Sequence, residues 1–168
     1  MIVNDPLHPT HSGLLVALAA GSTLALVLVA QYGFGLPPCE MCHWQRWPHI
    51  AALIFGLGAF ALPRWRAQLL ALAGLSFAIT GGIGVFHAGV EWKWWQGLTS
   101  CGGLGPTPIT LEELRAQILS APVVRCDEAA IRVLGLSMAG WNALWSAALA
   151  ILTLLAARRA GNVSGENA

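Results

Sequence analysis

Long runs of hydrophobic residues alternate with shorter polar segments along this chain. Four runs are long enough, or nearly so, to cross a bilayer as helices of about 20 residues; they cover residues 13–31, 44–62, 69–90 and 139–157. No lysine or aspartate lies within them, and their only arginine is Arg46, at the edge of the second. The pattern predicts an all-α membrane protein, a bundle of four transmembrane helices forming one domain over residues 1–168.

The first run is expected to stay in the mature protein. No lysine or arginine precedes it, and it is longer than the roughly 7 to 15 apolar residues of a cleavable signal peptide. Composition agrees with a membrane setting: 56% of the residues are hydrophobic and 10% are charged, against about 25% charged residues in soluble domains.

The polar segments predict an orientation and two outer loops. Arg64 and Arg66 separate the second and third runs, and Arg158 and Arg159 follow the fourth. Because Lys and Arg mark cytoplasmic loops, this side is predicted to be cytoplasmic, together with both termini. The outer side then receives a short loop over residues 32–43 and a long loop over residues 91–138.

The long outer loop is predicted to contain a short amphipathic helix. Thr110 and Glu113 have the spacing of a capping box, and apolar residues recur at helical spacing after them. This helix would either lie on the outer membrane surface or pack on the outer ends of the bundle.

All four cysteines fall in the two outer loops, as Cys39, Cys42, Cys101 and Cys126. Thiols outside the cytosol can cycle through disulfides, so two pairs suggest an electron relay. If the second helix begins near Cys42, its amide groups and Arg46, one turn later, would lower the pKa of this thiol. The guanidinium could bind a carbonyl oxygen or an oxyanion; alternatively, it only anchors the helix to lipid headgroups.

Other interpretations of the cysteines stay open at this point. Cys39, Cys42 and His43 form a C-x-x-C-H string, the attachment pattern of c-type haem. That interpretation leaves Cys101, Cys126 and Arg46 without a role. A zinc site is disfavoured because only one pair has ligand spacing. In a third interpretation, the protein is a non-catalytic membrane subunit whose disulfides staple its outer loops.

Two segments resemble one known family. Residues 38–46, Pro-Cys-Glu-Met-Cys-His-Trp-Gln-Arg, are similar to the P-C-x-x-C-x-x-x-R signature of the DsbB family of quinone-dependent membrane proteins. Residues 126–128 and 134–142 are similar to that family's segment from the last cysteine into the fourth helix. The resemblance covers nearly the whole chain, including four spans and both cysteine pairs.

The resemblance implies a thiol:quinone oxidoreductase of the bacterial inner membrane, with periplasmic cysteine loops. Its partners would be a DsbA-like thioredoxin-fold protein of the periplasm and the membrane pool of ubiquinone or menaquinone, with no nucleic acid. Cys101 and Cys126 match the pair that the partner attacks, and Cys101 matches the position of the mixed disulfide. Cys39 and Cys42 match the pair beside the quinone, where Cys42 donates to the ring.

Two further positions belong to the implied quinone site. Arg46 matches the arginine that holds the quinone and stabilises its reduced charge. His87, near the outer end of the third run, falls close to a histidine placed by the quinone in some members; it could equally be a hydrogen-bonded interfacial side chain. Gln45 departs from the acidic residue that some members have before the arginine, and the turn-rich second loop leaves the partner's identity undetermined.

Overall fold

The structure, a computed structural model, describes residues 9–97, 110–120 and 124–166. Its elements, in chain order, are α1 (Pro9–Leu28), the π-helical turn η1 (Val29–Gly33), α2 (Glu40–Ala61), the 3-10 turn η2 (Pro63–Trp65), α3 (Arg66–Glu91), α4 (Leu111–Ser120), β1 (Arg132–Val133), β2 (Leu136–Ser137) and α5 (Met138–Glu166). The all-α character predicted from the sequence is confirmed.

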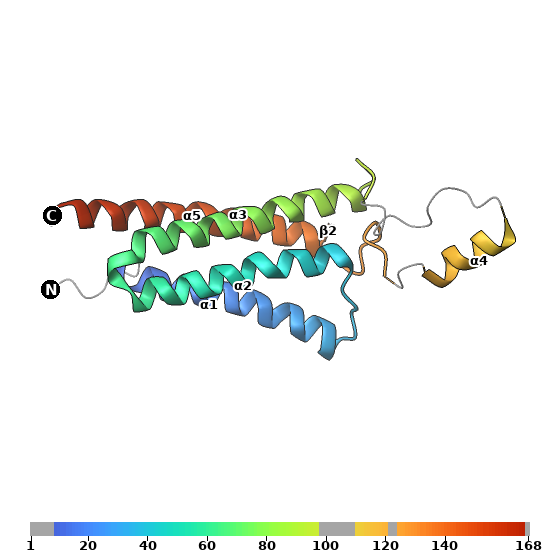
Figure 1. The fold of residues 1–168 in the computed structure, drawn as a ribbon, viewed down its shortest axis with the longest axis horizontal. Helices are drawn as coiled ribbons and strands as arrows, with labels where there is room; N and C mark the ends of the chain where they lie inside the picture. Colours follow the sequence, from blue (N-terminus) through green and yellow to red (C-terminus); the bar gives the residue numbers. More distant parts are fainter. Residues whose placement is uncertain (1–8, 98–109, 121–123, 167–168) are drawn as a thin grey trace.

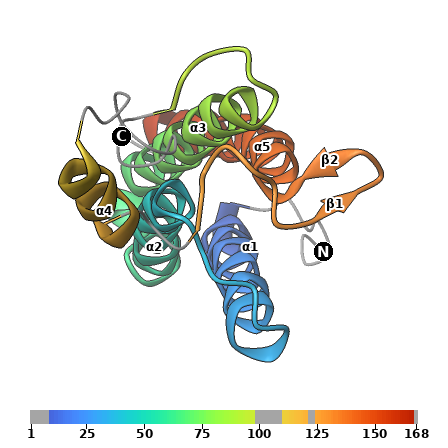
Figure 2. The ribbon, with the colours of Figure 1, turned by 90° about the vertical axis from the view of Figure 1, so that its right-hand side faces the viewer.

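Four of the helices, α1, α2, α3 and α5, run side by side along the length of the molecule (Figure 1). α3 and α5 make the most extensive contact, and α2 packs between α1 and α3. α1 begins and α5 ends at one end of the bundle, whereas α2 begins and α3 ends at the other (Figure 1). We call this second end the outer end. There α1 leans away from its neighbours (Figure 2), so the helices diverge where the cysteine motif lies.

Small residues let the helices approach closely. A Cβ atom on Gly56 of α2 would lie 2.8 Å from the backbone nitrogen of Ala17, and one on Gly13 of α1 would lie 2.5 Å from that of Phe60. Such small-residue contacts are typical of helices packed within membranes, where dispersion forces at short range replace the hydrophobic effect. The contact fixes α1 against α2 at the end opposite the cysteines.

Three helical segments of the described chain are long and apolar enough to cross a membrane: His11–Gly33, Pro63–Glu91 and Met138–Asn162. The sequence predicted four, and α2 is the one that falls short. Its 22 residues suffice in length, but Gln45, Arg46 and His49 in its first half lower its hydropathy. The structure therefore confirms three candidate spans, and the fourth remains a prediction.

The outer loop holds one predicted and one unpredicted element. The capping box of α4 is formed: Glu113 N–H donates to Thr110 Oγ1 at 3.2 Å, and Thr110 N–H donates to a Glu113 oxygen at 3.1 Å. β1 and β2 make a small antiparallel hairpin that the sequence analysis missed. Its turn residues, Leu134 and Gly135, both have positive φ, as tight hairpins require.

Candidate functional site

A cavity of about 420 Å³ opens at the outer end, between α1, α2, α5 and the segment that precedes α5. Its walls are largely apolar side chains. Polar and charged groups meet there too; they are Thr23, Cys39, Cys42, Gln45, Arg46, His49, His87, Glu91, Arg125, Glu128 and Asn142. An apolar cavity with a few converging polar groups is the usual form of a small-molecule site.

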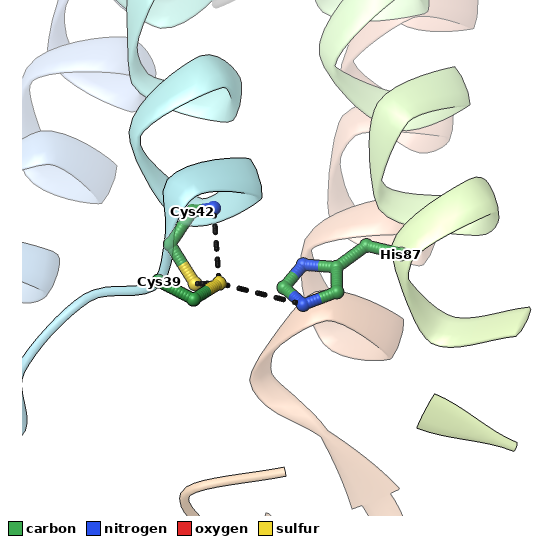
Figure 3. A group of neighbouring side chains, drawn as sticks. All are labelled: Cys39, Cys42 and His87. Atoms are coloured by element: carbon green, nitrogen blue, oxygen red, sulfur yellow. Dashed lines mark hydrogen bonds between the residues drawn. The ribbon is translucent and has the colours of Figure 1, made fainter. Parts of the chain in front are cut away.

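The Cys39 and Cys42 side chains lie together at the start of α2 (Figure 3). Their sulfur atoms are 2.8 Å apart, and Cys39 Sγ also accepts the Cys42 N–H at 3.3 Å. Cys39 is the N-cap residue, because α2 begins at Glu40. The helix was expected to begin near Cys42; it begins two residues earlier, and an amide group of its first turn, the Cys42 N–H, is bound by the Cys39 sulfur.

The pair is electrostatically asymmetric. A hydrogen bond from the Cys39 thiol to the Cys42 sulfur, helped by burial, raises the pKa of Cys39 to about 12. The same hydrogen bond lowers the pKa of Cys42 against the opposing effect of burial. Cys42 is thus the better thiolate, as expected from the sequence, but the main cause is its neighbouring thiol.

His87 of α3 faces this pair. Its Nε2 atom lies 3.6 Å from Cys39 Sγ (Figure 3) and 3.7 Å from Glu91 Oε1. Its Nδ1 atom receives a hydrogen bond of 2.9 Å from the Gln45 side-chain amide. His87 is only 2% exposed, so the ring is a fixed part of the site rather than a side chain in the interfacial water.

Arg46 lies on the cavity wall with Cys42. Its Nη1 atom donates to Gln31 Oε1 of η1 at 2.8 Å. This bond joins the outer end of α1 to the first turns of α2, so the guanidinium is oriented by the protein. Cys42, Arg46 and His87 are therefore assembled around one space.

Cys126 approaches the first pair from the outer loop. It is 1% exposed and packs in one cluster with Cys39, Met41 and Val90. The residue after it, Asp127, is bound by Arg125 and by Lys93 at the end of α3. Hydrogen bonds from Arg125 hold the pKa of the Asp127 carboxyl well below its ordinary value, so this anchor stays charged at neutral pH. Cys101 lies outside the described residues.

The ligand atoms of Cys39, Cys42 and His87 all lie within 4.8 Å of one another, which raises the question of a metal site. The geometry argues against one. Two thiolates on a tetrahedral zinc ion would be about 3.8 Å apart, whereas these sulfur atoms are 2.8 Å apart. Because Gln45 donates to Nδ1 of His87, the ring proton sits on Nε2, the atom that would have to bind the metal.

Several buried or half-buried polar residues around this site were not predicted from the sequence. Gln45 had been noted only as a departure from a family pattern, and Thr80, Glu91 and Asn142 had not been singled out. Each lies in or at the end of a hydrophobic run, and polar side chains at such positions are costly unless they have partners. A polar residue within a hydrophobic run was therefore the sequence signal that could have identified these four residues.

Comparisons with known proteins place the chain among disulfide bond formation proteins. The sequence model of the family described as Disulfide bond formation protein DsbB matches residues 9–156. Disulfide bond formation protein B of Xanthomonas euvesicatoria pv. vesicatoria is 34% identical over 155 residues, which are 88% of this chain and 89% of the relative. The protein of that name from Actinobacillus pleuropneumoniae is 44% identical over 75 residues, 39% of this chain and 42% of the relative. No solved structure gives a significant match.

Proposed function

This chain belongs to the DsbB family of disulfide bond formation proteins, and from this premise we propose that it is a thiol:quinone oxidoreductase of the bacterial inner membrane. It would reoxidise a DsbA-like thioredoxin-fold protein on the periplasmic side and pass two electrons to ubiquinone or menaquinone. The observation that carries the proposal is the position of Cys39 and Cys42, which line an apolar cavity together with Arg46.

The relay begins when a thiolate of the partner attacks Cys101. A mixed disulfide forms, and Cys126 leaves as a thiolate; the partner's second thiolate then releases the oxidised partner and frees Cys101. Cys126 attacks Cys39, which lies in the same packed cluster, and Cys42 leaves as a thiolate. Each exchange breaks one disulfide and forms another, so the number of disulfides and the number of electrons stay the same.

Two steps complete the cycle. Cys101 attacks Cys126, which restores their disulfide and leaves Cys39 and Cys42 as a dithiol pair. The pair then gives two electrons to the quinone, which also takes up two protons and becomes a quinol, while the Cys39 to Cys42 disulfide forms again. The lowered pKa of Cys42 suits it to act as the electron donor.

The cavity suits a quinone headgroup and the start of an isoprenoid tail. Its volume of about 420 Å³ falls within the usual range of small-molecule sites. Arg46 presents a permanently charged guanidinium to a carbonyl oxygen, and the bond to Gln31 keeps it in place. Trp141 and Trp145 of α5 supply flat apolar walls.

The competing interpretations fit the arrangement less well. In a c-type haem site His43 would face the metal, but His43 is exposed and is not among the residues that line the cavity. A structural staple would join distant parts of the chain, whereas Cys39 and Cys42 lie three residues apart at one helix start. A disulfide that closes so short a loop restrains the unfolded chain very little.

The outer end is proposed to face the periplasm. Arg64 lies in η2, Arg66 begins α3, and Arg158 and Arg159 lie in the last part of α5. These segments are at the opposite end of the bundle (Figure 1), and basic residues mark the cytoplasmic side. Four crossings, with α2 as the fourth, would leave both termini in the cytoplasm.

The purified protein tests this proposal directly. With dithiothreitol as the electron donor and a short-tailed quinone as the acceptor, we expect loss of quinone absorbance that Cys42→Ser abolishes. An absorption spectrum of the same sample checks the rival function. A Soret band, or quinone reduction that persists in Cys42→Ser, would contradict the proposal.

A further inference from the structure

A continuous chain of side-chain hydrogen bonds crosses three helices and ends at the cysteine pair. Ser146 Oγ donates to Asn142 Oδ1 at 3.1 Å, and Asn142 Nδ2 donates to Gln45 Oε1 at 2.7 Å. Gln45 Nε2 donates to His87 Nδ1 at 2.9 Å, and His87 Nε2 faces Cys39 Sγ at 3.6 Å. All of these hydrogen bonds point the same way: the donor of each lies nearer to Ser146 and the acceptor nearer to the Cys39 sulfur.

Backbone carbonyl oxygens fix the direction of this chain. Gln45 Nε2 also donates to the carbonyl oxygen of Met41 at 3.2 Å; a reversed amide would bring two oxygen atoms together there. Asn142 Nδ2 lies 3.2 Å from Thr80 Oγ1 and 3.5 Å from the Thr80 carbonyl oxygen. Because carbonyl oxygens only accept, both amides can be satisfied in one orientation alone.

The orientation of the amides determines where the His87 proton resides. Gln45 Nε2 can only donate, so Nδ1 of His87 must offer its lone pair and the proton must be on Nε2. The Cys39 sulfur and the Glu91 carboxylate, which both lie near Nε2, are acceptors. The ring is therefore constrained from both sides to one tautomer.

We propose that Gln45 and Asn142 are positioning residues that hold His87 as an Nε2–H donor aimed at Cys39. This inference rests on the proposed function, since it assigns the donor a role in the thiol relay. Cys39 must leave as a thiolate when Cys101 attacks Cys126, and it must bond to Cys42 when the pair gives its two electrons to the quinone and the first disulfide forms again. A fixed N–H donor stabilises the anionic sulfur in both steps.

Other charged groups near His87 must be considered in any measurement against pH. On α3 it faces Glu91, and from α2 and the outer loop it faces Cys39, Cys42 and Cys126. The same cavity also contains Arg46, His49, Arg125 and Glu128. A direct reading of the His87 ring nitrogens is therefore a sharper test than a pH optimum of turnover.

The test uses reduced full-length protein labelled with ¹⁵N-histidine in detergent micelles, with the His87 signals assigned from a His87→Asn variant. At neutral pH we expect Nε2 to be protonated and Nδ1 to be unprotonated. Gln45→Glu places an acceptor opposite Nδ1 and should move a proton onto it. Gln68→Glu makes the same change on an exposed part of α3 and should leave the spectrum unchanged.

Alkylation of Cys39 provides a second readout in a Cys42→Ala background. Gln45→Met and Asn142→Leu each remove a link of the chain, and we expect either to slow Cys39 alkylation at pH 8 by about threefold or more, because the donor loses its orientation. Gln68→Met should have no effect.

A wild-type His87 protonated on Nδ1, or a Gln45→Glu ring that keeps Nδ1 unprotonated, would overturn the inference; so would unchanged alkylation in both link variants. Neither readout uses a quinone or a partner protein. If both readouts agree with the inference but the protein reduces no quinone, the tautomer assignment stands and the proposed function is refuted.

Discussion

At the scale of single residues, the two neighbouring thiols differ because one donates a hydrogen bond to the other. Cys39 is buried at the N-cap and donates to Cys42, so the proton of the pair stays on Cys39 and the charge on Cys42. The sequence alone placed Cys42 near a helix start and favoured it as the thiolate. It could not show that Cys39 donates to Cys42, because that depends on how the two side chains are placed in the folded protein.

The asymmetry predicts how alkylation depends on pH. Because the pKa of Cys42 is lowered, its thiolate should persist below the range in which an ordinary thiol, with a pKa of about 8.5, loses its charge. Iodoacetamide labelling of the reduced protein, followed by mass spectrometry, should show Cys42 reacting at lower pH than Cys39. Cys39→Ala removes the donor and should move the Cys42 midpoint upward; an unchanged midpoint would refute the assigned cause.

Arg46 yields a prediction about quinone binding. Arg46→Ala should raise the quinone KM and lower turnover, at a cost of about 1.5 to 3 kcal/mol for a lost charge-assisted hydrogen bond. Arg46→Lys should rescue only part of the loss, because the ammonium lacks the planar fork. Gln31→Ala should have a smaller effect of the same kind, since it only frees the guanidinium.

Steady-state kinetics with a short-tailed quinone measure these effects. Arg64→Ala, which removes the same charge at the opposite end of the bundle, serves as the control and should be neutral. Wild-type kinetics in Arg46→Ala would reduce this residue to a lipid anchor.

At the scale of elements, long hydrophobic runs located the long helices well. They could not decide whether α2 crosses the membrane. Its outer half carries polar side chains that face the cavity and its neighbours in the bundle, including Gln45 and His49. A hydropathy pattern averages over all faces of a helix and cannot separate a lipid-facing side from an inward one. The β1–β2 hairpin was missed for another reason: its strands have two residues each, too few for an alternating pattern.

The contact between α1 and α2 gives a prediction of stability. Gly56→Ala places a Cβ atom 2.8 Å from the Ala17 backbone nitrogen, so the helices must separate, at a cost of about 1 to 3 kcal/mol. Gly82→Ala is the matched control, because a Cβ there meets nothing within 4 Å. Thermal unfolding in detergent, followed by circular dichroism, should show a lower midpoint for Gly56→Ala alone. Equal midpoints would show that α1 does not pack as described.

At the scale of the whole molecule, the fold places reactive side chains from separate segments together at the outer end. α2 contributes Cys39 and Cys42, α3 contributes His87, and the outer loop contributes Cys126. Sequence motifs singled out the cysteines and predicted the family; the comparisons confirm the family. The motifs could not predict that Cys126 packs with Cys39 or that α5 helps to orient His87 through Asn142. These contacts join distant parts of the chain: Asn142 and Gln45 are 97 positions apart, and Gln45 and His87 are 42 positions apart.

The central claim is that electrons enter at Cys101 and Cys126 and leave through Cys39 and Cys42. Its most direct test compares two donors, a reduced thioredoxin-fold dithiol protein and dithiothreitol, with the same soluble quinone as acceptor. Cys101→Ser and Cys126→Ser should each abolish quinone reduction by the protein donor but leave reduction by dithiothreitol measurable, because the small dithiol can reach the first pair directly. Equal loss with both donors, or undiminished reduction by the protein donor, would contradict the account.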